Sequence, residues 1–430
     1  MLKVHTYASL SDQDLEQLCM RNADSDQAIR QQTLDILEKV RTEGDAALRF
    51  YNKTFDRVEN EALVIQGEAL DALADQISRA EKRALEIAFN NIHRFHQRQA
   101  MREKPIETSP GVTCWREMRP IERVGLYVPG GTAVLPSTLL MLGVPAKIAG
   151  CKTIVVCTPP RLDGSVSPYL AYCARLLQID RFYLTGGAQA VAAMAYGTAS
   201  IPKVDKIFGP GNQYVTMAKQ LIQGGTAIDM PAGPSEVLVI GDARSNPAFI
   251  AADLLAQAEH GVDSKAVLLS TNQDLIEKVN QALALQLEQL ERRTFAEKAL
   301  QGSFAVLCTD LDEAFHFSNL YAPEHLILAL EDAESHTRSI QHAGSVFLGH
   351  LCPESMGDYA SGTNHTLPTS GYAKAYSGVS LDSFVKKVTF QKVDEQGLKY
   401  LGPTVEILAE IESLQAHKNS VSIRLQSLDA

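Results

Sequence analysis

Short β-branched runs that end in glycine-rich turns alternate with helical segments between about Arg123 and Ile240. The five runs are VGLYVPGG, KTIVVCTPP, RFYLTGGAQA, KIFGPGNQY and SEVLVIGD. Buried parallel strands separated by helices give this pattern, because a parallel connection crosses over through a helix that covers the sheet. The chain is therefore predicted to contain a parallel α/β sheet, with ligand sites at the carboxyl ends of its strands.

A second series of strand and helix patterns runs from Ser264 to about Leu348. Its predicted strands are KAVLLST, SFAVLCTD, HLILAL and GSVFLG. A chain of 430 residues exceeds what one hydrophobic core usually holds. We predict an α/β fold with two Rossmann-like parallel-sheet domains plus small N- and C-terminal extensions.

The two ends of the chain carry other patterns. About the first hundred residues have helical periodicity, and after Asp382 a β-like KKVTFQKV is followed by helices. His93 and His96 lie three apart in a predicted helix, which imitates a pair of metal ligands. Because that helix is rich in arginine, we interpret both as surface histidines.

Composition narrows the class of protein. A formal net charge of −11, without a basic stripe, argues against binding to a nucleic-acid backbone. Seven widely spaced cysteines, an odd number, fit free thiols in a reducing compartment, so we expect a cytoplasmic protein. We find neither an export signal nor a membrane segment. Small-molecule chemistry is favoured.

Several metal-competent side chains are spread along the chain. In NPAFIAADLLAQAEHG, a helix capped by Asn246 and stopped by Gly261 would place Gln257 and His260 side by side. With Asp358 and His417, these two would make a plausible mixed ligand set for zinc. The spacing also fits a polar helix face near a C-terminal cap, and the sequence has no HExxH and no CxxC motif.

The glycine turns suggest a nucleotide site only weakly. GPGNQY, at Gly209 to Tyr214, has the first two glycines of GxGxxG and lacks the third. Such turns also serve as tight strand-to-helix connections. Their number favours a ligand, because three glycine-bearing turns at equivalent strand ends could line one crevice.

Several longer motifs carry a resemblance to a known family. They are VGLYVPGG, FGPGNQYV, AGPSEVLV, AQAEHG, YAPEHL, AGSVFLG, GDYASGTNHTLPT and GLKYLGPTVEILAEIESLQAHKNSVSIR. In their order and spacing, from roughly residue 25 to the C-terminus, they resemble the histidinol dehydrogenase family. The resemblance implies a zinc-dependent homodimer that oxidises L-histidinol to L-histidine with NAD, through an aldehyde, as the last step of histidine biosynthesis.

The resemblance also implies roles for individual residues. The implied metal ligands are Gln257, His260, Asp358 and His417. The implied acid/base pair is Glu324 and His325, and the implied NAD contacts are Tyr127, Gln189 and Asn212. The implied substrate contacts are Ser235, Gln257, His260, His325, Asp358, Glu412 and His417.

The resemblance to this family further implies how the chain divides. A metal- and acid/base-bearing α/β domain would comprise 25–128 and 236–380, and 129–235 would form the NAD-binding domain. Residues 1–24 would be an N-terminal helical extension. In the C-terminal extension, 381–430, Glu412 and His417 would reach the active site of the other protomer.

The implied acid/base pair suits the chemistry. Hydride leaves an alcohol carbon only as the hydroxyl proton is removed, which suits the imidazole of His325. Oxidation of the aldehyde first requires addition of water, and Glu324 could take the proton of that water. Without the resemblance, a Glu-His pair after a proline is also the pattern of a strand start with an exposed carboxylate.

Two other functions remain open from the residues. In a zinc hydrolase, Glu324 would activate a metal-bound water and no nicotinamide would be needed. In a catalytically silent nucleotide-binding protein, the glycine turns would hold a ligand and the polar cluster would be structural. Formation of NADH from histidinol distinguishes both from a dehydrogenase.

Overall fold

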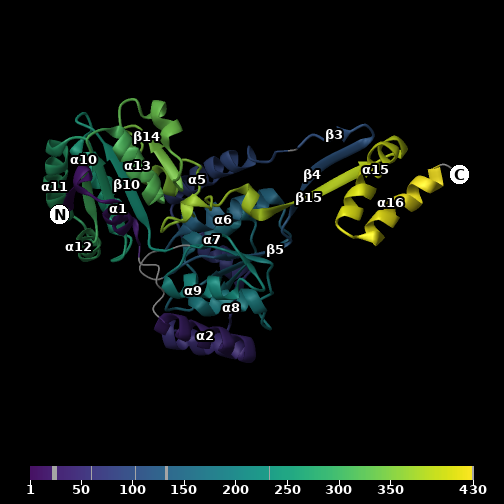
Figure 1. Ribbon diagram of the computed structural model, residues 1–430. Helices are drawn as coiled ribbons and strands as arrows, with labels where there is room; N and C mark the ends of the chain where they lie inside the picture. The colour runs from purple at the N-terminus through teal and green to yellow at the C-terminus, as the bar shows by residue number, and fades with distance from the viewer. Residues whose placement is uncertain (22–26, 60, 102, 131–133, 232, 429–430) are drawn as a thin grey trace.

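The computed structural model describes residues 1–430 apart from 22–26, 60, 102, 131–133, 232 and 429–430. The described residues form two six-stranded sheets and one three-stranded sheet, with helices packed around the two larger sheets (Figure 1). The predicted α/β fold is confirmed. None of the described helices has the length and apolarity needed to cross a membrane.

The first large sheet has the strand order β1-β12-β11-β10-β13-β14, and all its pairs are parallel. Its strands are β1 (Lys3–Thr6), β10 (Glu236–Gly241), β11 (Lys265–Ser270), β12 (Phe304–Leu307), β13 (His325–Ala329) and β14 (Ser345–Leu348). Val237 and Val239 pack in one core and Leu238 and Ile240 in another, so β10 is buried on both faces. This burial explains the continuous apolar runs.

The helices of this sheet lie on opposite faces. They are α1 (Asp12–Cys19), α10 (Pro247–Ala258), α11 (Gln273–Leu287), α12 (Arg293–Gln301), α13 (Leu311–Tyr321) and α14 (Glu354–Tyr359). The predicted cap of α10 is confirmed, because the Asn246 side chain accepts a hydrogen bond from the Ala248 backbone N–H at 2.9 Å.

The second large sheet has the order β2-β7-β6-β5-β8-β9, with β2 antiparallel to β7 and the other pairs parallel. Its strands are β2 (Val64–Gln66), β5 (Arg123–Tyr127), β6 (Thr153–Thr158), β7 (Arg181–Leu184), β8 (Lys206–Phe208) and β9 (Ala227–Ile228). Its helices are α2 (Gln27–Glu43), α3 (Asp45–Tyr51), α4 (Glu68–Ala74), α5 (Arg79–Gln97), α6 (Pro136–Ala149), α7 (Pro168–Leu177), α8 (Gly187–Tyr196) and α9 (Gln213–Ile222).

The membership of the sheets differs from the expected division of the chain. Strands β2 and β5, from the segment 25–128, pair within the second sheet rather than with 236–380. Strand β1, from the expected helical extension 1–24, forms the edge of the first sheet. The run SEVLVIGD contributes β10 to the first sheet, although the four runs before it build the second. Local periodicity shows that a strand exists but not which distant strand pairs with it.

The C-terminal segment forms an arm that projects from the two sheets (Figure 1). Strand β15 (Val385–Val393) pairs antiparallel with β4 (Val112–Pro120), which also pairs with β3 (Ile106–Ser109). The helices α15 (Glu395–Ile411) and α16 (Gln415–Leu428) follow at the end of the arm. Large apolar side chains of this arm, such as Ile407 and Ile411, are exposed.

One interpretation of a histidine is wrong. His96 is buried, not at the surface, and its Nδ1 atom lies 2.9 Å from the Ile92 carbonyl oxygen. The side chain of Asn364, from the long loop after α14, also contacts the ring and donates to the Met141 carbonyl oxygen at 2.6 Å. A helical pattern does not reveal that a distant loop covers this face.

Candidate active site

The predicted acid/base pair lies at the amino end of β13. Helix α13 ends at Tyr321, Ala322 takes a left-handed conformation with φ of 52°, and Pro323 leads into Glu324 and His325. Strand β13 pairs with β10 in a register that sets His325 opposite Val237. The pair therefore lies at the amino ends of two parallel strands, whereas the general rule favours carboxyl ends.

The ring of His325 is buried and held at both nitrogens. Its Nδ1 atom lies 3.2 Å from the backbone carbonyl oxygen of Glu236, and its Nε2 atom lies 3.3 Å from Oδ1 of Asp358. A carbonyl oxygen only accepts, so Nδ1 carries a proton and Nε2 is the atom that exchanges one. Burial alone would lower the pKa of His325, but the charges of Glu324 and Asp358 outweigh it and raise the pKa to about 10.

The carboxyl group of Glu324 is buried beside this ring. Its Oε2 atom accepts a hydrogen bond from the Glu236 backbone N–H at 2.9 Å and lies 3.6 Å from His325 Nδ1. Burial raises the pKa of Glu324 to about 8, although the His325 charge and the Glu236 N–H oppose the shift. The alternative of an exposed carboxylate at a strand start is excluded. A buried carboxyl group with this pKa can act as a base near neutral pH.

Three predicted metal ligands come near this pair. Gln257 is at the end of α10, and its Nε2 atom lies 3.1 Å from His260 Nδ1. Burial alone would raise the pKa of Asp358, but the hydrogen bond from His325 and the charges of His325, His365 and His260 lower it. Asp358 is thus an ionised carboxylate surrounded by imidazoles. Ser235 directly precedes β10, one residue before Glu236.

Within one chain, the structure does not bring Glu412 and His417 to the cluster around Glu324 and His325. Glu412 and His417 lie at the junction and start of the helices α15 and α16, are exposed, and belong to the far end of the arm (Figure 1). Among the described residues, no group of three or more His, Cys, Asp or Glu side chains is arranged to hold a metal ion. Of the predicted ligands in the body of the chain, only His260 and Asp358 belong to these types.

The predicted NAD contacts follow strands β5, β7 and β8 at their carboxyl ends. Tyr127 ends β5, and its hydroxyl accepts a hydrogen bond from the Gly187 backbone N–H at 3.1 Å. Gln189 is buried in α8, and Asn212 caps α9 by accepting from the Tyr214 and Val215 N–H groups. The sheet therefore places the three residues at one edge.

The glycine turns of this edge touch one another. Gly209 has φ of 123°, and a Cβ atom built there would lie 2.1 Å from the Tyr127 carbonyl oxygen. Cβ atoms built at Gly130 and Gly186 would lie 3.0 Å and 2.3 Å from the Pro159 ring. The turns after β5, β7 and β8 are thus packed closely enough to form one surface, and only glycine fits at Gly209.

His365, to which the sequence assigned no step, connects the two regions. Its Nδ1 atom lies 2.9 Å from the Asp358 carbonyl oxygen, and its Nε2 atom lies 3.0 Å from the Thr138 hydroxyl at the start of α6. Helix α6 follows β5, so this ring joins the carboxyl edge of the second sheet to the acid/base cluster of the first.

Sequence reasoning missed a further buried carboxyl group, that of Glu354. It is 1% exposed, and neither of its oxygens has a hydrogen-bond partner among the residues that the structure describes. Burial raises its pKa to about 8, while the His325 charge opposes the shift. The only available signal was its position four residues before Asp358, on the same short helix.

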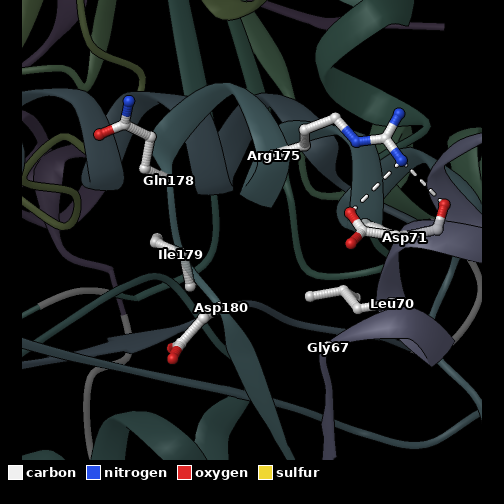
Figure 2. Close-up of a pocket in the computed structure, with 8 residues that line it drawn as sticks. Gly67, Leu70, Asp71, Arg175, Gln178, Ile179 and Asp180 are labelled. Carbon is white, nitrogen blue, oxygen red and sulfur yellow. Dashed lines mark hydrogen bonds and ion pairs between the residues drawn. The ribbon is translucent and has the colours of Figure 1, made fainter.

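A surface hollow elsewhere takes no part in this site. Figure 2 shows it between α4 and α7, with Arg175 paired to Asp71 at 3.4 Å. Its lining residues are Gly67, Leu70, Asp71, Ala171, Arg175, Gln178, Ile179 and Asp180. None of the predicted site residues lines it.

Two helix-covered and mainly parallel sheets, one with a buried acid/base pair and the other with an edge of packed glycine turns, fit an α/β enzyme of the dehydrogenase class. The sequence profile of the histidinol dehydrogenase family matches residues 19–425. The chain belongs to the histidinol dehydrogenase family, which makes it an oxidoreductase and confirms the predicted resemblance.

Relatives and a solved structure agree with this assignment. The chain is 52% identical over 429 residues to histidinol dehydrogenase of Bacteroides thetaiotaomicron, covering 100% of both chains. It is 50% identical over 433 residues to the chloroplastic histidinol dehydrogenase of Arabidopsis thaliana, covering 100% of this chain and 92% of the relative. The crystal structure of histidinol dehydrogenase from Elizabethkingia anophelis aligns with a TM-score of 0.96 at 49% identity, covering 100% and 99% of the two chains.

Proposed function

We propose that this chain oxidises L-histidinol to L-histidine in two NAD-dependent steps, through L-histidinaldehyde, as the last step of histidine biosynthesis. The observation that carries the proposal is the buried pair of Glu324 and His325, held by the backbone of Glu236 in a member of this family. Two adjacent groups with separate proton tasks suit two successive oxidations at one carbon.

In the first step the alcohol loses a hydride to NAD and its hydroxyl proton to a base. His325 acts as that base in its deprotonated form, with Nδ1 engaged by the Glu236 carbonyl oxygen and Nε2, which faces Asp358, accepting the proton. Because nearby carboxylates raise the pKa of His325 to about 10, this form is the minor one at neutral pH and the step should become faster as pH rises. The products are the aldehyde, NADH and a proton. Burial excludes bulk water, which strengthens the electrostatic hold on the developing alkoxide.

In the second step water adds to the aldehyde, and the hydrate loses a second hydride. Glu324 takes the proton of the attacking water, since burial raises the pKa of its carboxyl group to about 8. His325 takes the proton of the hydrate hydroxyl from which hydride departs. The products are the carboxylate, a second NADH and two protons.

The residues present fit a divalent cation of the zinc type. The Oε1 atom of Gln257 is a buried oxygen without a hydrogen-bond partner in the described part of the chain, and it lies on the side chain that contacts His260. Gln257, His260, Asp358 and His417 of a second copy would hold the ion, one per protomer. When bound, zinc supplies positioning by taking the imidazole and amino nitrogens of the substrate.

Substrate and nucleotide contacts complete the proposal. Ser235 and, from the second copy, Glu412 would accompany the metal ligands and His325 around the substrate. Tyr127, Gln189 and Asn212 would contact NAD at the packed glycine turns, which His365 links to the acid/base cluster.

The exposed arm supports the proposed homodimer with shared active sites. Glu412 and His417 are exposed at the end of the arm, and exposed apolar residues on α15 offer a surface for a second copy. The seven cysteines are all free thiols, which supports the prediction of a reducing compartment such as the cytoplasm.

One assay tests the function. The purified protein is incubated with limiting histidinol and excess NAD, with and without a chelator, and NADH is counted per histidinol. We expect two NADH per substrate and loss of turnover with the chelator. A hydrolase would form no NADH, and a silent binding protein would retain NAD affinity without turnover.

A further inference from the structure

A buried ion pair lies directly behind the acid/base pair. The Arg21 guanidinium meets the Glu236 carboxylate with Nε 2.8 Å from Oε2 and Nη2 2.9 Å from Oε1. The two side chains are 8% and 1% exposed. The Nη2–Oε1 contact is a hydrogen bond, whereas Nε lies at ion-pair distance from Oε2 without the geometry of a hydrogen bond. This two-point contact restricts the directions of both side chains.

Glu236 is the residue whose backbone holds both members of the acid/base pair. Its N–H donates to Glu324, and its carbonyl oxygen accepts from His325 Nδ1. Its side chain touches neither group and instead accepts from the Ser370 backbone N–H at 2.9 Å. The position of this one peptide segment therefore determines the orientation of the carboxyl group and of the imidazole ring.

Arg21 also fixes the turn that leads into the pair. Its Nη2 atom donates to the Tyr321 carbonyl oxygen at 2.7 Å, and its guanidinium lies 3.7 Å from the centre of the Tyr321 ring. Tyr321 ends α13, three residues before Glu324. One guanidinium thus ties together the two segments, at β10 and β13, whose junction forms the acid/base pair.

A wholly structural role would not require this ion pair. Burying two charges carries a desolvation cost, and apolar side chains of similar size often stabilise a fold equally well. We propose that Arg21 and Glu236 are positioning residues for the acid/base pair, so that the N-terminal segment forms part of the active-site framework. This inference rests on the proposed function for its kinetic readout.

The charge of this pair also acts on Glu324. The charged groups around Glu324 are His325, Glu236, Asp358 and Glu354. The negative charge of Glu236 raises the pKa of Glu324, and the nearby Arg21 offsets that charge. Removing the Glu236 charge leaves Arg21 unpaired and should lower this pKa. Burial raises the pKa of Glu236 and Arg21 opposes that shift, so removing Arg21 lets Glu236 bind a proton and should change the pKa of Glu324 much less.

The test compares Arg21→Met, Glu236→Gln and the double variant as full-length, zinc-loaded protein. We expect each single variant to lose about 10- to 100-fold in kcat, with the KM for NAD unchanged. The pH midpoint of aldehyde oxidation should move down in Glu236→Gln, by roughly half a unit or more, and should change less in Arg21→Met. The double variant should return toward the wild-type midpoint. Arg293→Met, which removes an exposed pair with Glu297, is the control.

The changes in kcat and in the pH midpoint separate positioning from stability. If all three variants keep the wild-type kcat and midpoint and only melt earlier, the ion pair serves the fold alone and the inference is wrong. Should a single variant fail to fold, the double variant and Arg21→Lys, which keeps the charge but loses the two-point contact, decide the matter. Arg21→Lys is expected to keep the midpoint and lose kcat.

Failure of the proposed function would be seen separately. Wild-type protein that forms no NADH from histidinol contradicts the function and not the positioning. The ¹⁵N chemical shift of His325 Nδ1 then decides the inference, because a protonated Nδ1 bonded to a carbonyl has a distinct shift. We expect that signal to change in Arg21→Met and to stay unchanged in Arg293→Met.

Discussion

The Nδ1 atom of His325 lies 3.2 Å from the backbone carbonyl oxygen of Glu236, and this contact decides which ring nitrogen keeps its proton and which one exchanges it. The backbone N–H of the same residue donates to Glu324. A single peptide segment at the start of β10 therefore orients two proton acceptors toward different tasks.

Glu324→Gln should separate the two half-reactions. The amide keeps the shape of the side chain but cannot take a proton from water, so aldehyde oxidation should slow by about 10²- to 10⁴-fold while alcohol oxidation stays largely intact. Stopped-flow measurement of NADH formation from histidinol and from histidinaldehyde checks this. Equal losses in both reactions would show that the division of roles between Glu324 and His325 is wrong.

Mixing two inactive variants should restore activity if the sites are shared. In a heterodimer of His325→Asn and His417→Ala, one site combines both defects and the other has neither. Random re-pairing should therefore recover about a quarter of the wild-type activity. Each variant re-paired alone is the control. Absence of recovery, with subunit exchange verified by mass spectrometry, would argue that each chain builds its own site.

Metal content gives a test that does not depend on turnover. Gln257→Leu removes the unpartnered Oε1 atom and should lower zinc affinity at least tenfold, because a buried oxygen ligand is lost. Zinc retained after dialysis against a graded chelator series measures the change. Gln286→Leu, on the neighbouring α11, is the control and should retain wild-type zinc. Unchanged zinc in Gln257→Leu would remove this residue from the ligand set.

Gly209→Ala should weaken NAD binding at the carboxyl edge of the second sheet. Its φ of 123° disfavours alanine, and the new Cβ atom would lie 2.1 Å from the Tyr127 carbonyl oxygen. The turn must shift, at a cost of roughly 1–3 kcal/mol, and the KM for NAD should rise while that for histidinol changes little. Gly224→Ala, where a Cβ atom meets nothing within 4 Å, is the matched control. A KM for NAD equal to wild type would contradict the placement of NAD here.

Glu354→Gln should stabilise the metal-free protein in a pH-dependent way. Folding raises the pKa of this buried carboxyl from 4.5 to about 8, so the proton is bound more tightly in the folded state. The wild-type group therefore costs increasing stability as pH rises from 4.5 to about 8. The gain in the variant should grow over this window to a few kcal/mol, since one pKa unit is about 1.4 kcal/mol.

Thermal unfolding in chelator at several pH values measures that gain. Exposed Glu291→Gln serves as control and should leave the pH dependence unchanged. A gain for Glu354→Gln that is the same at pH 5 and pH 9 would show that the carboxyl group ionises normally in the folded protein.

Much of the fold could be predicted because its signals are local. The runs that became β5 to β8 and β10 to β14 carry their apolar pattern in consecutive residues, and the Asn246 cap lies beside the helix that it starts. Pairing of β1 and β2 with distant strands left no such local sign. The expected division of the chain therefore differs from the observed sheets in where it assigns the segments 1–24 and 25–128.

The candidate site likewise depends on contacts between distant segments, which leave no local sign in the sequence. The position of Glu324 and His325 at the amino ends of strands runs against the usual expectation, and only tertiary packing reveals it. The surroundings of His96 and His365 are set by the long loop after α14. Asn364 of this loop contacts the His96 ring, and the His365 ring, in the same loop, contacts Thr138. Glu354 has no motif of its own. Sequence motifs therefore identified Glu324 and His325, whereas the buried carboxyl group of Glu354 is identified only by its burial in the structure.

The placement of the acid/base pair at the amino ends of β10 and β13 leaves the opposite rim of that sheet without any predicted site residue. At this rim, Ala243 and Arg244 form an exposed turn directly after β10. A fluorophore or surface tether attached there would point away from the reacting groups. The enzyme could then be immobilised or labelled at a rim remote from Glu324 and His325.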